Sequence, residues 1–331
     1  MKLLKPQPLI PRYYEPVQAD LEQVFFDLVF KPVVAVIKEA TPQPVILNTT
    51  LDALEQALKT GRVQYDDGIF SGQFSAAISR ALRSFGAALD DRDGTYRIKP
   101  ELVPANIRVI AQNTAAEARR SHDLVLKALD DAAADVERAQ QAGWEVGATG
   151  LIERVDADYR AVAKELTVSP DLSDFAKANL AADYNKSMSL NIRGWAHSQI
   201  EALREQVEEN AKTGYRFDTL IDRIKHQYST TQSKAEFLAR QETGLYMAKF
   251  RRESLTSVGV NGYVWHARSA SLTRPAHWAL NNRLYLYSQP PVTSPDGRHN
   301  NPGEDFNCLC VDRPVLGQVM PHQIGQIYKA A

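Results

Sequence analysis

The spacing of hydrophobic positions predicts that residues 51–212 are mostly helical. Apolar side chains recur there at every third or fourth position, which is the period of one helix face. Pro104 and Gly143 stand where one long helix would begin and end, because proline fits a first helical turn and glycine favours the position after the last. Ser169-Pro170-Asp171 is a second start signal, and Gly214 is a second stop. We therefore expect long antiparallel helices here, with no catalytic grouping among them.

The first 50 residues have a different character, because seven prolines lie between Pro6 and Pro44. Proline removes a backbone donor and interrupts helices, so only the apolar block Leu21–Ile37 favours one. The sequence therefore predicts an extended, Pro-rich arm over residues 1–50, with a short helix near Asp20–Phe30, lying across another surface. A flexible N-terminal extension is the alternative.

The hydrophobic period changes in the last third of the chain. A helical stripe covers residues 231–258, and the apolar positions then alternate as in strands over residues 262–266, 284–287 and 309–315. Turn-forming Pro, Gly, Asn and Asp residues separate these strands. We therefore expect an α+β fold, with long helices in the N-terminal two thirds and a C-terminal helix packed on a small, loop-rich β unit.

These patterns divide the chain into four parts: the arm (1–50), the helical region (51–212), an α+β domain (213–320) and a C-terminal tail (321–331). Charge is uneven between them. Residues 213–331 hold 14 Lys and Arg against 9 Asp and Glu, a formal charge of +5, although the whole chain carries -1. A surface that coats nucleic acid throughout is therefore excluded, whereas a basic contact with DNA in the C-terminal part is not.

Composition excludes several other classes of protein. With 44% hydrophobic and 24% charged residues, wholesale disorder is not expected. No apolar run reaches the roughly 18–20 residues that a membrane span needs, and the start of the chain has no secretory stretch. The sequence also lacks a Gly-x4-Gly-Lys-Ser/Thr phosphate loop, a Gly-x-Ser-x-Gly elbow and a His-Glu-x-x-His pair. We expect no membrane partner and synthesis in a reducing cytoplasm.

Charged residues on the 231–258 helix raise two questions. Glu242 lies on the apolar stripe, and a buried carboxylate must find a cation or hydrogen-bond donors. We favour a structural ion pair with Arg274, the alternative being a catalytic acid or base. Arg251 and Arg252 lie near the end of the helix; we favour solvated arginines stabilised by the helix dipole, the alternative being a contact with phosphate.

The two cysteines form a candidate metal site. Cys308 and Cys310 lie on one face if their segment is extended, because strand side chains repeat every two residues. Together with His277 and His299 they would make the Cys2His2 set that zinc accepts tetrahedrally, stapling a unit with few apolar residues. The alternative is two half-buried, reduced thiols.

Five short segments follow one another in the last third of the chain. They are Ala239-Arg240-Gln241-Glu242, Gly259 to Trp265, Arg274-Pro275-Ala276-His277, Asn301-Pro302-Gly303 and Cys308-Leu309-Cys310. In this order, across residues 210–316, they resemble the phage Mu F-type minor head (head morphogenesis) proteins. In that family an Ala-Arg-Thr-Glu segment precedes a tryptophan strand, an arginine-rich His motif and a closing Pro-Gly and Cys-x-Cys.

The sequence also departs from that family pattern. Ala270 and Leu272 replace an Asp and an Arg before the histidine, and Asn281 or Asn282 stands where the family has glycine. Packing can compensate for a lost charged pair in a structural role, but an active site tolerates such a loss poorly. The expectation is therefore a motif that holds the fold together, built from Arg240, Glu242, Trp265, Arg274 and His277.

The resemblance implies a minor structural protein of a tailed phage, made in the host cytoplasm and located in the virion head at the portal vertex. Its expected partners are the portal protein, the major capsid protein or scaffold, and packaged double-stranded DNA, during procapsid assembly, DNA packaging or DNA delivery. We expect no enzymatic activity. Two alternatives stay open: a metal-assisted nuclease or phosphodiesterase with His277 or His299 as general base, and a DNA-binding accessory protein that uses the +5 region.

Overall fold

The computed structural model describes residues 2–6, 8–40, 50–143, 151–162, 171–212 and 217–328, and it confirms the predicted α+β class. The chain forms two compact units. The first comprises Met1–Val24, Ala139–Ile192 and Thr231–Ala331, and the second comprises Phe25–Arg138 and Arg193–Thr230. Because several helices contribute residues to both units, the units do not follow the order of the sequence. The four-part division of the chain stays a prediction.

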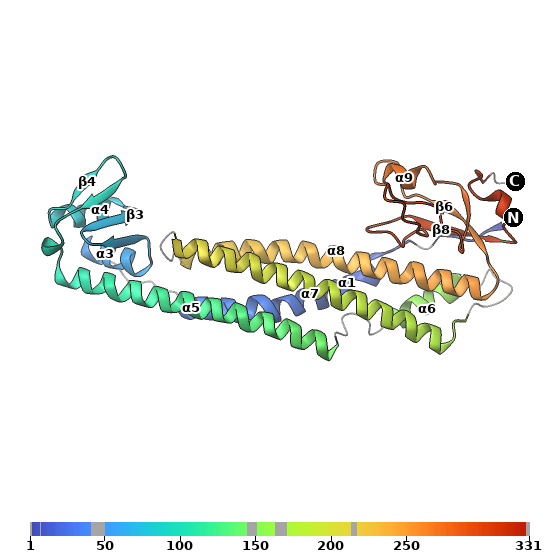
Figure 1. Cartoon of the computed structure of the whole chain (residues 1–331), viewed down its shortest axis with the longest axis horizontal. Helices are drawn as coiled ribbons and strands as arrows, with labels where there is room; N and C mark the ends of the chain where they lie inside the picture. Colours follow the sequence, from blue (N-terminus) through green and yellow to red (C-terminus); the bar gives the residue numbers. More distant parts are fainter. Residues whose placement is uncertain are drawn as a thin grey trace. The chain divides into compact units, whose positions relative to one another are not determined.

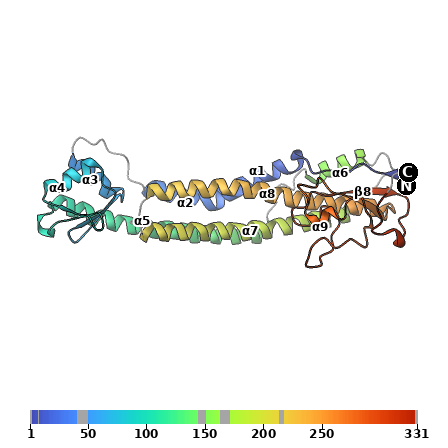
Figure 2. The same ribbon diagram turned by 90° about the horizontal axis from the view of Figure 1, so that it is seen from above.

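Helices make up most of the described chain (Figures 1 and 2). Helix α5 confirms the predicted helix between Pro104 and Gly143. None of the described helices is both long and apolar enough to cross a lipid bilayer. The helices are α1 (Pro11–Phe25), a π-helical turn (Phe26–Phe30), α2 (Lys31–Ala40), α3 (Thr50–Lys59), α4 (Ala76–Ser84), a 3-10 turn (Pro100–Leu102), α5 (Ala105–Ala142), α6 (Leu151–Val162), α7 (Asp174–Lys212), α8 (Phe217–Ser257), α9 (Pro275–Trp278) and a second 3-10 turn (Pro321–Gln323).

The N-terminal arm is less extended than predicted. The helix expected near Asp20–Phe30 begins at Pro11 and continues, through the π-helical turn, to Ala40. Pro16 lies inside α1 and cannot donate to the carbonyl of Arg12, four residues earlier. Arg154 supplies the missing donor, because its Nη1 lies 2.9 Å from that carbonyl oxygen. A side chain distant in the sequence therefore satisfies the carbonyl group that Pro16 leaves without a backbone donor.

The prediction of helices throughout residues 51–212 was wrong for its first third. A four-stranded antiparallel sheet with the order β2-β3-β5-β4 lies there beside α3 and α4 (Figure 1, blue and cyan). Asp67 and Gly68 join β2 to β3 with φ angles of 38° and 86°, as an Asp-Gly hairpin turn requires. The strands are too short to show a clear alternation. They are β2 (Val63–Asp66), β3 (Ile69–Gly72), β4 (Ala88–Asp90) and β5 (Thr95–Arg97).

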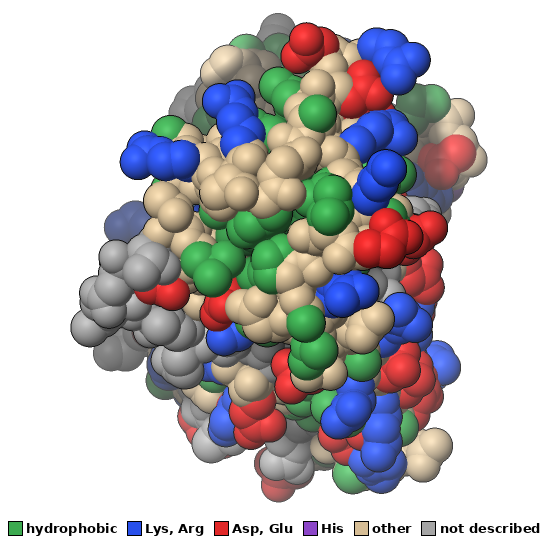
Figure 3. All heavy atoms as spheres, turned by 90° about the vertical axis from the view of Figure 1, so that its left-hand side faces the viewer, with side chains coloured by type: hydrophobic (Ala, Val, Ile, Leu, Met, Phe, Trp, Pro, Cys, Tyr) green, Lys and Arg blue, Asp and Glu red, His purple; other side chains and the backbone are tan. Residues whose placement is uncertain are grey.

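This small module has a core of its own, centred on Leu54, Phe70, Leu82 and Tyr96. Figure 3 shows hydrophobic side chains, in green, gathered near the middle of the face on the left of Figure 1, with Lys and Arg around them. Leu102, in the 3-10 turn of the module, remains 59% exposed. The module therefore carries both a closed core and some apolar surface.

The C-terminal sheet confirms the three predicted strands. They are β6 (Gly262–His266), β7 (Leu284–Leu286) and β8 (Val311–Leu316), in an antiparallel sheet of order β1-β8-β6-β7. The edge strand β1 (Lys2–Leu3) comes from the N-terminal segment and was not expected. We call β1, residues 259–328 and their loops the C-terminal β unit. Its central apolar side chains are Val264, Leu284, Leu286, Val315 and Val319.

The described part of the predicted tail belongs to this unit. Ile324 and Tyr328 pack against its core, and Ile327 pairs with Arg283 in an isolated antiparallel bridge. Two other expectations concern the helix ends. Helix α8 begins at Phe217, well before the predicted Thr231. The signals at Ser169-Pro170 and Gly214 lie outside the described residues.

The middle of α7 gives the first testable prediction. Gly194 is exposed there, and a Cβ atom added to it would meet nothing within 4 Å. Glycine costs a helix interior about 1 kcal/mol relative to alanine, so Gly194→Ala should stabilise the fold by that amount. We expect thermal denaturation followed by circular dichroism to show a melting temperature roughly 2–4 °C higher.

Gly68 offers the matched comparison in the same compact unit. An alanine there would require a left-handed residue with a side chain and would overlap the carbonyl oxygen of Ile98. Gly68→Ala should therefore lower the melting temperature. A lower melting temperature for Gly194→Ala would contradict the conclusion that an alanine fits at this position of α7 without strain.

Candidate metal centre

Three potential metal ligands converge in the C-terminal β unit. His277 lies on α9, which Pro275 begins, whereas Cys308 and Cys310 lie in the extended segment before β8. The Nδ1 atom of His277 is 3.4 Å from the sulfur of Cys308 and 3.8 Å from that of Cys310. All three potential ligand atoms lie within 4.8 Å of one another. The group could therefore hold a metal ion.

The separations of these atoms suit tetrahedral zinc. Bonds of about 2.3 Å to sulfur and about 2.05 Å to nitrogen, at the tetrahedral angle, place the two ligand atoms about 3.6 Å apart. The two observed nitrogen–sulfur distances, 3.4 and 3.8 Å, lie on either side of that value. A cavity of about 220 Å³ borders all three side chains, and Arg274 and Asn307 also line it. A fourth ligand would approach from there.

Asp305 orients the histidine for this role, although the sequence analysis did not single it out. Its Oδ2 atom lies 3.0 Å from Nε2 of His277, and both side chains are almost fully buried. Burial by itself raises the pKa of Asp305, but the backbone N–H of Phe306 and the charge of Arg274 outweigh it, so the pKa is lowered. The ionised carboxylate accepts a hydrogen bond from Nε2–H, which keeps Nδ1 facing the sulfurs, where it can bind a metal once it has lost its proton. Ligating histidines in proteins are commonly held in this way.

The electrostatics of the two thiols also favour metal binding. The pKa of Cys308 is lowered to about 5, first because the thiol of Cys310 donates a hydrogen bond to its sulfur. His277 and the backbone N–H groups of Gly303 and Cys310 lower that pKa further, against the effect of burial. The pKa of Cys310 is raised, because its proton is held in that hydrogen bond and the site is buried. The pair thus provides one thiolate before any metal arrives, and thiolate is the form that binds metals.

Packing fixes the imidazole from another side. Trp265 of β6 is fully buried, and its ring meets that of His277 edge-on, with centroids 5.5 Å apart and planes at 86°. Gly303 has a φ of 83°, and a Cβ atom there would lie 2.9 Å from the Cβ of Ala248 on α8. Trp265 therefore packs directly against one of the potential ligands, and Gly303 lets its loop approach α8 closely.

His299, predicted as the fourth ligand, does not join the other three residues. Its Nδ1 donates to the carbonyl oxygen of Pro290 at 2.7 Å, its side chain is exposed, and it is absent from the cluster of possible metal ligands among the described residues. Val292 and His299 pair as an isolated β-bridge in the loop after β7. That local pairing turns the imidazole away, a feature that spacing in the sequence does not reveal.

The predicted ion pair between Glu242 and Arg274 does not form in the described structure. Arg274 donates to the carbonyl oxygen of Phe306 at 2.6 Å and lies 3.5 Å from Asp305, beside the cysteine cluster. Glu242 accepts a hydrogen bond from Asn191 of α7 at 3.0 Å instead. Arg240, two residues before Glu242 on α8, lies over the ring of Tyr14 and 3.6 Å from Glu236. Helix α7 therefore satisfies Glu242 with neutral donors, and α9 brings Arg274 to a different acid.

Burial of Glu242 gives the second prediction, which concerns pH. Its pKa is raised, chiefly by burial, although hydrogen bonds from Ser187 and Asn191 and the charge of Lys249 act in the other direction. Because the folded pKa lies above the unfolded one, ionisation costs stability as pH rises through the folded pKa. Glu242→Gln keeps the shape and removes this cost. We expect the variant to be more stable than the parent at pH 7, with the difference vanishing below about pH 4.5.

Chemical denaturation of both proteins between pH 4 and pH 8 measures that difference. Glu236→Gln is the matched control, because Glu236 lies on the same helix with its side chain 46% exposed. The difference in stability between Glu236→Gln and the parent should show no comparable rise with pH. A Glu242→Gln variant that is less stable than the parent at pH 7 would show that the carboxylate itself is needed.

The interpretation of Arg251 as a solvated arginine was also wrong, whereas Arg252 is partly exposed. Arg251 is 5% exposed, lies 3.3 Å from Asp312 of β8 and donates to the backbone carbonyl of Lys5 at 3.1 Å. Arg252 forms an ion pair of 2.6 Å with Glu304. Tyr287 donates a further hydrogen bond to Asp312. These arginines attach α8 to the C-terminal β unit; Arg251 is buried there, whereas Arg252 stays partly exposed.

Comparison with known proteins gives two matches. The family model described as Phage Mu protein F like protein matches residues 201–313, about a third of the chain. An uncharacterized protein of Haemophilus influenzae is 26% identical over 182 residues, which are 51% of this chain and 38% of that protein. The chain thus spans well under half the length of this relative. No solved structure gives a significant match.

Proposed function

Residues 201–313 are a domain of the Phage Mu protein F like family, as the sequence resemblance indicated, and on that premise we propose that this chain is a minor structural protein of a tailed-phage head. It acts in head morphogenesis, in procapsid assembly, DNA packaging or DNA delivery. Its partners are the portal protein and the major capsid protein or scaffold, with packaged double-stranded DNA as a further contact. Its place is the virion head, at the portal vertex.

The arrangement around His277 supports a structural role over catalysis. A general base needs a nitrogen within reach of a substrate proton. Both nitrogens of His277 are engaged, Nδ1 with the two sulfurs and Nε2 with Asp305, and the side chain is 1% exposed. This engagement is the observation that favours a fold-holding motif over the nuclease alternative.

We further propose that the ion held by His277, Cys308 and Cys310 is zinc, acting as a structural staple. Two thiolates and an imidazole are a donor set that zinc prefers over calcium or magnesium. The C-terminal β unit has a small apolar core, so a metal staple would add substantially to its stability. The ion would bind the three side chains while Asp305 holds the imidazole in place.

Quantitative mass spectrometry of purified phage particles tests the assignment to the head. We expect this chain in a few copies per particle, far fewer than the major capsid protein. Deleting the gene should leave particles without a normally filled head, and the full-length gene supplied in trans should restore them. Particles that assemble, fill and infect without any of this chain would contradict the proposal.

Two assays separate the alternatives. DNA hydrolysis by the purified protein that is lost in His277→Ala would replace the structural role with a metal-assisted nuclease. DNA affinity that falls steeply with salt would support direct contact of the +5 region with packaged DNA, whereas affinity unaffected by salt would exclude it.

A further inference from the structure

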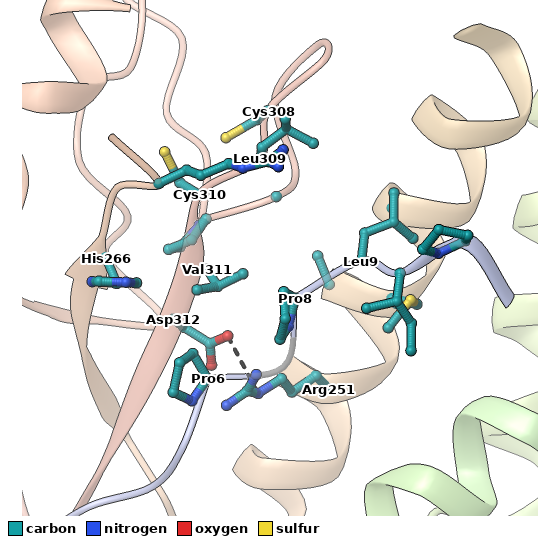
Figure 4. A pocket seen from close by; sticks show the side chains of 18 residues that line it. Pro6, Pro8, Leu9, Arg251, His266, Cys308, Leu309, Cys310, Val311 and Asp312 are labelled. Carbon is teal, nitrogen blue, oxygen red and sulfur yellow. Dashed lines mark ion pairs between the residues drawn. The ribbon is translucent and has the colours of Figure 1, made fainter. Parts of the chain in front are cut away.

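A second cavity lies in the same compact unit and has walls of mixed character. Its volume is about 510 Å³, within the usual range for small-molecule pockets. The N-terminal segment, α8 and the stretch from Cys308 to Asp312 enclose it (Figure 4). Pro6, Pro8 and Leu9 run across the view from below its centre toward the right, and the ion pair of Arg251 with Asp312 lies close to Pro6. The cavity therefore combines an apolar wall with a charged end.

Arg251 supplies an unused hydrogen-bond donor at that end. Its Nη2 donates to the carbonyl of Lys5, and its Nε faces Asp312, but its buried Nη1 has no protein partner in the described residues. A buried donor without a partner costs roughly 1–3 kcal/mol, so such groups call for an explanation. A ligand in the cavity would satisfy this donor.

Two other polar side chains line the cavity, and one of them carries a positive charge. Arg268 lines the cavity, is exposed and makes no ion pair within the described part of the chain. Nδ1 of His266 is buried and lacks a hydrogen-bond partner among the described residues. The negative charge of Asp312 is already offset by Arg251 and by the hydroxyl of Tyr287. The charge of Arg268 therefore remains for a ligand.

We propose that this cavity binds the carboxylate of a ligand with an apolar body, such as the C-terminal end of a peptide. The guanidinium groups of Arg251 and Arg268 hold the carboxylate, and His266 adds a hydrogen bond. The apolar body packs on Pro8, Leu9 and Met247, which line the same cavity. Guanidinium groups match carboxylates in geometry as well as in charge.

The walls favour a carboxylate ligand over a nucleic-acid phosphate. A duplex is too large for a cavity of about 510 Å³, and its phosphates carry no apolar group to cover the prolines and Leu9. A peptide terminus supplies both an anion and apolar side chains, which is a recurring mode of peptide recognition. This proposal does not depend on metal binding by His277, Cys308 and Cys310.

Isothermal titration calorimetry of the full-length protein with N-acetyl-Leu-Leu tests the proposal. The same peptide with an amidated C-terminus is the matched control. We expect the free acid to bind at least about tenfold more tightly than the amide, because a charge-assisted contact is lost. Arg268→Met should weaken binding of the free-acid peptide by a similar factor without lowering the melting temperature of the protein. Arg223→Met, an exposed arginine elsewhere in the chain, should change nothing.

Gly244 provides a variant that fills the cavity without touching the arginines. A Cβ atom there would make ordinary contact, 3.7 Å, with Leu9, so Gly244→Leu directs its side chain into the pocket. Binding of the acid should be lost in this variant. Equal affinity for acid and amide, or no binding at millimolar concentration, would overturn the proposal. Binding of inorganic phosphate but not of the peptide would overturn it too, in favour of a simple anion site.

Discussion

Replacing Cys310 with serine is expected to remove the bound metal and to destabilise the C-terminal β unit. Purified parent protein should contain about one zinc ion per chain, and the variant none, because only two of the three ligands would remain. At free zinc a thousand times the dissociation constant, binding stabilises a fold by about 4 kcal/mol. The melting temperature should therefore fall by roughly 10 °C. Metal analysis with thermal denaturation measures both effects.

Three controls define the ligand set. Parent protein treated with a chelator should melt at the same temperature as Cys310→Ser, because both lack the ion. His299→Ala should keep its metal, since that histidine lies outside the cluster. Asp305→Asn should retain the ligands but bind zinc about 10–100-fold more weakly, the usual cost of a lost outer-sphere partner. Parent protein that carries no metal and is indifferent to the chelator would reduce the cluster to hydrogen-bonded thiols.

Local signals explain why part of the fold could be predicted from sequence. The strands of the C-terminal β unit alternate cleanly and are separated by strong turn residues, so all three were identified. Asn282, one of the two asparagines that stand where the resembled family has glycine, has a φ of 60°, in the left-handed region that glycine favours. The module of β2 to β5 was missed, because its strands have only three or four residues and its Asp67-Gly68 turn was overlooked. The helical spacing of apolar residues in the rest of 51–212 then led to a prediction of helices for the whole region.

The candidate site could be predicted only in part, for a different reason. Cys308, Cys310 and His277 were found because their chemistry is visible in single residues. Asp305 was missed, since its role depends on a contact with His277 across 28 positions. Arg251 was misjudged for the same reason, as its partner Asp312 lies on a distant strand. Residue type indicates which side chains can bind a metal, whereas the pairing of particular acidic and basic side chains depends on the tertiary structure.

The buried pair of Arg251 and Asp312 gives the other large expected effect. Their side chains are 6% and 10% exposed, so removing one partner leaves a charge inside the protein. Breaking such a pair typically costs about 3–5 kcal/mol. Arg251→Met should therefore destabilise the first compact unit by that amount, as measured by chemical denaturation. Arg252→Met should cost less, because Arg252 is 27% exposed in its pair with Glu304.

A double-mutant cycle shows whether the charge of Asp312 causes this loss. Asp312→Asn removes the charge but keeps the partner of the Tyr287 hydroxyl. If the unpaired carboxylate dominates, Arg251→Met with Asp312→Asn should lose less stability than the two single changes added together. The difference should be about 1–3 kcal/mol, the range found for residues in direct contact. Additive losses would mean that Arg251 acts mainly through its packing and its bond to Lys5, and that the ion pair itself contributes little.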